Sequence, residues 1–181
     1  MVSEVELIEK GKAGDRDAMA ELLKSYEKRI YSYLCRMLSN HHDAEEVTQE
    51  TFVRVIRNIG KYREEGLFKS WIFQIAYREG LKKIKKRDLP FDLEELPEQE
   101  EPTAGPDEIL FSSERIGEIT EAIQKLPPME KQVVLLRAYS GMTFKEIAQT
   151  MDTPLNTALG RMRNASIRLR KSLNETADKH R

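Results

Sequence analysis

The 181-residue sequence contains a single cysteine, so no disulfide framework can hold the chain together. Proline is absent before Pro90, and no apolar run approaches the roughly 20 residues that a membrane-spanning helix needs. No secretory signal is recognisable at the N-terminus, which predicts a cytoplasmic protein without membrane insertion. Cys35 lies beside Leu34 and Leu38 in a helical apolar pattern, so we interpret it as a core thiol.

The sequence also lacks the residue sets that carry catalysis. It contains no Ser/His/Asp or Cys/His set and no glycine-rich phosphate loop. The pair His41-His42 invites a metal site, but His180 is the only other histidine and there is no second cysteine, so tetrahedral N/S ligation is not available. We therefore expect no enzymatic activity, no metal and no cofactor.

Charge is distributed unevenly, although the net charge is only −1. Residues 88–114 contain no Lys or Arg, ten acids and four of the seven prolines, whereas residues 1–87 and 115–181 carry net charges of +4 and +5. An acidic, proline-rich segment between two basic blocks predicts two small domains, 1–87 and 115–181, joined by a flexible acidic linker over 88–114.

Apolar residues recur at helical spacing through residues 1–87, which predicts an all-α first domain. The expected helices are Val5–Lys10 (ended by Gly11 and Gly14), Asp15 or Asp17 to about Ser39, Asp43 to about Ile59, and one that begins near Phe68. The predicted core stripe of the last helix leaves Phe73 and Tyr77 outside it, and consists of Trp71, Ile72, Ile75, Ala76 and Ile84.

Four polar residues of the helix expected at Asp43 lie on a face separate from its apolar stripe, and we call them the acidic strip: Asp43, Glu46, Gln49 and Glu50. Acids in a first turn are also favoured by the helix dipole, but this explains neither Gln49 nor Glu50. We interpret the strip as a docking surface for an arginine-rich helical partner.

Aromatic and basic residues are interleaved from Lys61 to Arg87, a mixture that can stack unpaired bases and hold phosphates. The candidate contacts with single-stranded nucleic acid are Lys61, Tyr62, Arg63, Trp71, Phe73, Tyr77, Arg78 and Lys82. Alternatively, Trp71 is a core residue and the lysines complement the helix C-terminus. The sequence leaves both interpretations of Trp71 open.

The second domain contains a predicted helix-turn-helix. Thr143-Phe144-Lys145-Glu146 has the form of a capping box, and Asp152-Thr153-Pro154 ends the short helix that follows it. Thr153 is the expected N-cap of a second helix, with Pro154 in its first position. The buried stripe of that helix is predicted to be Ala158, Met162, Ala165, Leu169 and Leu173.

The second of these helices is basic, because Leu155–Lys171 contains no acid. Two short helices, a tight turn and a basic second helix are typical of a DNA-binding helix-turn-helix. The alternative is an ordinary helical hairpin with a solvated basic face, which would have the same amino-acid composition.

Three segments in order resemble the signature segments of extracytoplasmic-function sigma factors, the small two-domain sigma subunits of bacteria: Asp43-Ala44-Glu45-Glu46-Val47-Thr48-Gln49-Glu50-Thr51-Phe52, Phe68-Lys69-Ser70-Trp71-Ile72-Phe73-Gln74-Ile75-Ala76, and Thr143-Phe144-Lys145-Glu146-Ile147-Ala148. The resemblance covers about Asp15 to Leu173. It implies a transcription initiation factor whose partners are core RNA polymerase, promoter DNA and an anti-sigma factor.

The resemblance implies that the acidic strip contacts the clamp helices of the polymerase, and that the aromatic and basic residues melt and capture the minus-ten promoter element. It also implies that the helix-turn-helix reads the minus-thirty-five element as a duplex, through Thr153, Asn156, Thr157, Arg161, Arg163 and Asn164. The linker of such factors threads the nucleic-acid channel of the polymerase; a solvated acidic tether is the alternative.

The sequence departs from the family where promoter specificity is encoded. The second helix usually begins Gly-Thr-Val-Lys-Ser, but here it reads Asn156-Thr157-Ala158-Leu159-Gly160. Arg78 and Lys82 stand where the family commonly has Asn and Asp. The promoter sequence that members of the family recognise therefore cannot be transferred to this chain. A free-standing helix-turn-helix regulator is the second hypothesis, although it would need neither the acidic strip nor the aromatic residues.

Overall fold

The computed structural model describes residues 2–63, 66–87 and 113–179, and the chain divides into two units, Met1–Glu101 and Pro102–Arg181. All regular structure among the described residues is helical, which confirms the predicted all-α class. The expected linker 88–114 lies outside the described residues except for Ser113 and Glu114, with which the first helix of the second unit begins.

Unit 1 consists of α1 (Glu4–Lys12), α2 (Arg16–Leu38), α3 (His41–Asn58), the short 3-10 helix η1 (Ile59–Lys61) and α4 (Phe68–Arg87). Polar side chains cap the first three helices, as the positive end of the helix dipole and its unpaired N–H groups require. Asp15 Oδ1 accepts from the N–H groups of Asp17 and Ala18, both at 3.0 Å. Asn40 Oδ1 accepts from the N–H of Asp43 at 2.8 Å, so α3 begins at His41, two residues before the predicted start.

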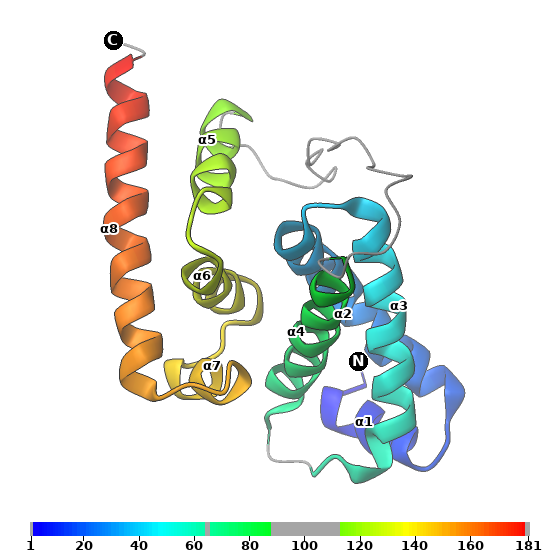
Figure 1. The fold of residues 1–181 in the computed structure, drawn as a ribbon. Helices are drawn as coiled ribbons and strands as arrows, with labels where there is room; N and C mark the ends of the chain where they lie inside the picture. Colours follow the sequence, from blue (N-terminus) through cyan, green and yellow to red (C-terminus); the bar gives the residue numbers. More distant parts are fainter. Residues whose placement is uncertain (1, 64–65, 88–112, 180–181) are drawn as a thin grey trace. The chain divides into compact units, whose positions relative to one another are not determined.

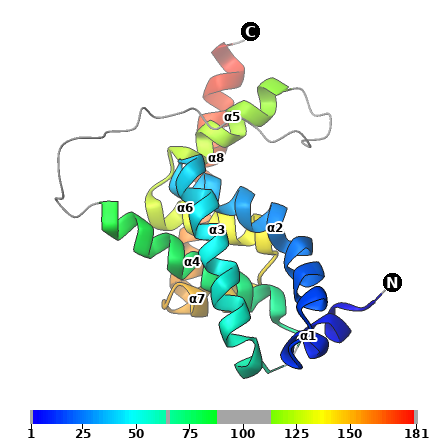
Figure 2. The same ribbon diagram turned by 90° about the vertical axis from the view of Figure 1, so that its right-hand side faces the viewer.

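Helices α2, α3 and α4 pack side by side, and α1 lies against α2 at the end where α3 gives way to η1 (Figures 1 and 2). The centre of this bundle is filled by large side chains without solvent exposure: Ile8, Leu22, Ile30, Tyr33, Leu34, Phe68, Ile72 and Phe73. The rings of Tyr33 on α2 and Phe73 on α4 meet edge to face at 5.5 Å between centroids.

Two glycines let helices approach closely in unit 1. A Cβ added at Gly11 would lie 2.3 Å from Met19 Sδ, and one added at Gly80 would lie 2.8 Å from Met37 Sδ. Helix α1 therefore continues through Gly11, contrary to the predicted end at this residue, because the glycine serves the contact with α2 rather than terminating the helix. Gly80 has the same role between α4 and α2.

Unit 2 consists of α5 (Ser113–Gln124), α6 (Pro128–Ser140), α7 (Phe144–Thr150) and α8 (Leu155–Lys179). Helices α5, α6 and α7 follow one another along α8 (Figure 1). Leu126, Val134 and Ala165 form a buried cluster against which Ile123, Met162 and Leu169 pack. The apolar stripe predicted for α8 is therefore the face of this helix that packs inward. Helix α6 ends at Gly141, which adopts the left-handed conformation with φ +66°.

The ammonium group of Lys131 on α6 lowers the stability of unit 2, because folding buries it. Burial lowers the pKa of its amine from 10.5 to about 8, so the native state binds this proton less tightly than the unfolded chain does. Stability should therefore rise with pH between about 8 and 10 through this group. We expect Lys131→Met to raise the unfolding temperature at pH 7, and the advantage to shrink as the pH approaches 10. Thermal unfolding followed by circular dichroism at both pH values measures this.

Lys125→Met provides the control, because Lys125 is exposed, follows directly after α5, and pairs among the described residues with Glu121, four residues earlier. This substitution should shift the unfolding temperature little and equally at both pH values. If Lys131→Met gains no more stability at pH 7 than at pH 10, burial of the ammonium is not the cause.

Candidate nucleic-acid interface

The helix-turn-helix is built by local capping. Thr143 Oγ1 accepts from the N–H of Glu146 at 3.3 Å, and Glu146 Oε2 accepts from the N–H of Thr143 at 2.7 Å, which confirms the predicted capping box. Asp152 reverses the chain with φ +48°. Helix α8 then begins at Leu155, and the carbonyl oxygen of Pro154 accepts from Thr157 and Ala158 at 3.0 and 3.2 Å. Pro154 thus takes the N-cap place predicted for Thr153.

The free face of α8 carries only some of the residues predicted to read duplex DNA. Asn156, Arg163 and Asn164 are exposed, opposite the buried Ala158 and Ala165. Thr153 and Thr157 are half-buried. Arg161 is also half-buried, and its Nη1 atom is enclosed without a hydrogen-bond partner among the described residues. Arg163 is therefore the better placed of the two arginines to contact DNA.

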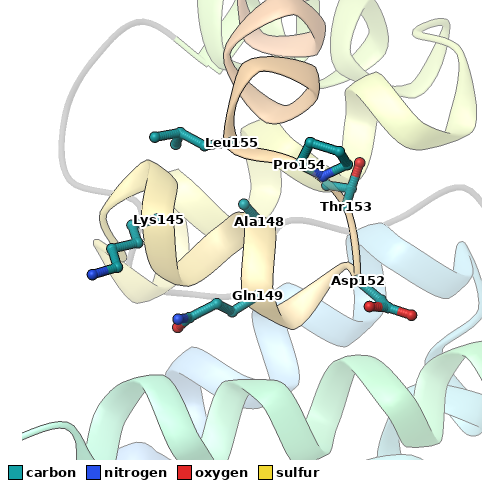
Figure 3. A pocket seen from close by; sticks show the side chains of 7 residues that line it. All are labelled: Lys145, Ala148, Gln149, Asp152, Thr153, Pro154 and Leu155. Carbon is teal, nitrogen blue, oxygen red and sulfur yellow. The ribbon is translucent and has the colours of Figure 1, made fainter.

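An open hollow of about 430 Å³ lies between α7 and the start of α8, lined by Lys145, Ala148, Gln149, Asp152, Thr153, Pro154 and Leu155. In the view of Figure 3, Lys145 and Leu155 lie on the left of the hollow, and Asp152 and Thr153 lie on the right. Beside the first turn of α8 the hollow is therefore mixed in character, with apolar surface from Ala148, Pro154 and Leu155 and with one cation and one acid in its lining.

The base-stacking role predicted for Phe73 and Tyr77 is contradicted by their burial. Phe73 has no exposed surface and Tyr77 is 3% exposed, because both belong to the inner face of α4. The buried residues of α4 are Phe68, Ile72, Phe73, Ala76, Tyr77, Glu79 and Gly80. This inner face is fixed by the contact of Phe73 with Tyr33 and by the close approach of Gly80 to Met37. Neither aromatic residue can receive a base without unpacking unit 1.

The outward face of α4 instead carries Trp71, Ile75, Arg78 and Lys82, which recur at spacings of four, three and four. Trp71 is half-exposed, and its ring lies 5.0 Å from that of Tyr62 and 5.6 Å from that of Phe68. This face joins an aromatic surface to two cations. The predicted core stripe was therefore wrong for Trp71 and Ile75, which lie on the face next to the buried one.

The loop before α4 extends the same surface. Lys61 and Arg63 are exposed on either side of Tyr62, whose ring is largely buried against Phe68 and Trp71. Lys12 Nζ of α1 lies 5.6 Å from the centroid of the Tyr62 ring. Helix α1 thus contacts the loop through Lys12, an interaction that the sequence pattern did not predict.

The acidic strip is partly engaged within unit 1. Lys83 Nζ of α4 lies 3.1 Å from Asp43 Oδ1 and 2.6 Å from Glu46 Oε2, and Arg87 Nη1 lies 3.4 Å from Asp43 Oδ2. The hydrogen bond from Lys83 lowers the pKa of the Glu46 carboxyl group. Asp43 is only 13% exposed at its side chain, whereas Glu46 is 58% exposed.

At the other end of the strip, Gln49 is exposed. Arg54 Nε lies 2.9 Å from both Glu50 Oε1 and Glu79 Oε1, and Lys82 Nζ lies 2.7 Å from Glu79. The outward groups of the strip are therefore Glu46, Gln49 and the half-exposed Glu50, while Asp43 ties α3 to α4. Sequence reasoning missed Lys83 as the internal partner, because the lysines near the end of α4 were interpreted either as phosphate contacts or as complements of the helix C-terminus.

Within the described ranges, no three His, Cys, Asp or Glu side chains are grouped so that they could hold a metal ion. None of the described helices is both long enough and apolar enough to cross a membrane.

Two protein-family models match the chain, one in each unit. Residues 22–89 match the Sigma-70 region 2 family, and residues 116–169 match Sigma-70, region 4. The first match contains the acidic strip and α4, and the second contains the helix-turn-helix.

Similar proteins include the ECF RNA polymerase sigma factor SigE of Mycolicibacterium smegmatis, which is 32% identical over 87% of this chain; the match spans only 63% of SigE. SigW of Bacillus subtilis, also an ECF RNA polymerase sigma factor, is 29% identical over 93% of this chain and 95% of its own length.

Two solved structures have the same fold. CnrH, in complex with the cytosolic domain of CnrY, has a TM-score of 0.69 and 16% identity over 97% of this chain and 99% of CnrH. The sigma factor RpoE of Bartonella quintana, in complex with the anti-sigma factor NepR, has a TM-score of 0.70 and 17% identity over 86% of this chain and 96% of RpoE.

Proposed function

The chain belongs to the extracytoplasmic-function sigma factors, and on this basis we propose that it binds core RNA polymerase and directs promoter-specific initiation of transcription. Unit 1 docks onto the polymerase and captures the minus-ten element, and unit 2 reads the minus-thirty-five element as a duplex. The factor acts in the cytoplasm and has no catalytic site of its own.

One observation carries this proposal: each unit presents a different surface suited to nucleic acid. Helix α8 offers Asn156, Arg163 and Asn164 on a free basic face, which suits the major groove of a duplex. Helix α4 offers a half-buried Trp71 on the same face as Arg78 and Lys82, which follow it two and three turns later and suit the phosphates of a strand whose unpaired base stacks on Trp71. A free-standing helix-turn-helix regulator would leave the second surface and the acidic strip without a purpose.

We also propose regulation by an anti-sigma factor. Support comes from the sigma factor RpoE of Bartonella quintana, which has the same fold and was solved in complex with the anti-sigma factor NepR. The segment 88–114 serves in this proposal as the linker that joins the two DNA-binding units, either within the polymerase channel or as a solvated tether.

The proposal is tested by reconstituting the full chain with core polymerase and transcribing a promoter library. We expect specific transcripts from a subset of promoters, and permanganate-reactive thymines near the start site where the duplex has melted. The absence of any transcript above that of core polymerase alone would overturn the proposal.

Two alanine variants should separate the two DNA surfaces. Arg163→Ala should weaken binding to the upstream duplex by about 5- to 150-fold, the effect of losing a base-reading arginine. Trp71→Ala should leave duplex binding intact but reduce permanganate reactivity, because stacking on an aromatic ring contributes about 1–3 kcal/mol per base. Footprinting and gel shifts with the full chain measure both. Normal melting by Trp71→Ala would show that Trp71 holds no base.

A further inference from the structure

Helix α8 opens with two exposed leucines in an otherwise polar and basic surface. Leu155 is 45% exposed and Leu159 is 41% exposed, and their spacing of four places them on one face of the helix. Leu155 also lines the hollow beside Ala148 and Pro154 (Figure 3). Neither leucine belongs to the buried stripe of Ala158 and Ala165, so packing within unit 2 does not explain them.

The residue after Leu159 is a glycine with no structural reason to be one. Gly160 lies within α8, where glycine weakens a helix relative to alanine. A Cβ added there would meet no atom within 4 Å, unlike at Gly11 and Gly80, where it would meet a methionine. Because glycine has no side chain and the space beside Gly160 is open, a ligand can approach the helix backbone closely at this position.

The charge around this spot favours a duplex rather than a protein as the ligand. Leu155–Lys171 contains no acid, and the exposed Arg163 lies one turn after Leu159. The hollow that Leu155 lines is also lined by the cation Lys145 and by Asp152, the acid that precedes this acid-free segment. Phosphates bind such cations, and the first residues of the second helix of a helix-turn-helix lie against base edges in the major groove.

The major groove offers one apolar group to such a surface, the C5-methyl of thymine. We propose that α8 recognises thymine in the upstream promoter duplex, with Leu159 against a C5-methyl group and Gly160 allowing the helix backbone to approach the neighbouring base pair. This inference rests on the proposed function and adds to it a base preference and the residues that determine it.

The test uses the full chain assembled with core polymerase. A duplex is first selected from a library randomised over the upstream element, and it is then synthesised with thymine or with uracil, which lacks only the methyl group. Replacing the contacted thymine by uracil should weaken binding of the native protein about fourfold, the effect of one buried methyl group. Leu159→Ala should bind the thymine duplex about as weakly as the native protein binds the uracil duplex, and should no longer distinguish the two duplexes.

Gly160→Ala separates recognition from stability. It should raise the unfolding temperature of unit 2 by about 4 °C, because alanine favours the helix and meets no neighbour. It should nevertheless weaken binding to the selected duplex about fivefold or more, the effect of a poorly fitted base pair. Ile167→Ala is the control, since it removes another exposed apolar side chain (58% exposed, against 41% for Leu159) two turns further along α8 and should keep the preference for thymine.

Each remaining outcome overturns the inference. Equal binding of the two duplexes by the native protein would show that no methyl group is read. A loss by Leu159→Ala that is the same on both duplexes would assign the leucine another role, and a loss of polymerase affinity alone would assign it to a protein contact. Failure to enrich any duplex would instead refute the proposed function itself, and the inference with it.

Discussion

Replacing Phe73 with alanine is expected to destabilise unit 1 strongly rather than to impair DNA melting alone. Its ring is fully buried between α2 and α4 and meets Tyr33 edge to face, so the substitution leaves a cavity at the centre of the bundle. Such a truncation costs about 3–5 kcal/mol, a large part of the roughly 5–15 kcal/mol that stabilises a typical domain. Urea unfolding followed by fluorescence of Trp71, the only tryptophan in the chain, reports on unit 1 specifically.

Ile56→Ala is the control for this experiment, because it shortens an exposed apolar side chain of α3 and should change stability by no more than about 0.5 kcal/mol. Should Phe73→Ala unfold at the same urea concentration as Ile56→Ala, the ring does not contribute to the core. A defect of Phe73→Ala in open-complex formation would then have to be explained by a direct contact with DNA.

Reversing the charge of Glu46 is expected to weaken binding to core polymerase by about 30- to several-thousand-fold. Breaking a desolvated charge pair at an interface costs on the order of 2–5 kcal/mol. Glu46 is the most suitable residue of the acidic strip for this test, because its side chain projects into solvent, whereas Asp43 is enclosed by Lys83 and Arg87. The affinity of Glu46→Lys for labelled core polymerase can be measured directly, with circular dichroism to show that the helices remain folded.

Lys83→Met separates docking from the internal ion pair. It removes the ammonium group that Asp43 and Glu46 share but leaves both carboxylates in place. If Glu46 meets a cation of the polymerase, this variant should bind core polymerase at least as well as the native chain, although unit 1 becomes less stable. A loss of affinity as large as that of Glu46→Lys would mean that the α3–α4 bridge, and not the carboxylate, is what the polymerase needs.

The fold could be predicted from the sequence wherever local chemistry decides it. The capping box at Thr143 and the apolar stripe of α8 each depend on residues close together in the chain, and both are present as expected. The end of α1 was predicted wrongly because Gly11 usually signals termination, whereas here it serves a contact with Met19, eight residues away on another helix. No local pattern distinguishes the two uses of glycine.

The candidate surfaces were harder to predict because α4 is apolar on more than one face. Trp71 and Ile75 fit a helical stripe as well as Phe73 and Tyr77 do, and only the packing of α4 against α2 and α3 decides which pair is buried. The same limit applies to charge. That Lys83 reaches Asp43 and Glu46 depends on how α3 and α4 pack, which is not apparent from any spacing along the chain.

The close approach of Gly80 to Met37 constrains how this protein can change over evolutionary time. A side chain at position 80 would occupy space that the end of Met37 now fills, so it requires the Met37 side chain to move aside or to be replaced by a shorter one. In relatives with the same helix packing, a residue larger than glycine at position 80 should be accompanied by one shorter than methionine at position 37. Gly11 and Met19 should covary in the same way between α1 and α2.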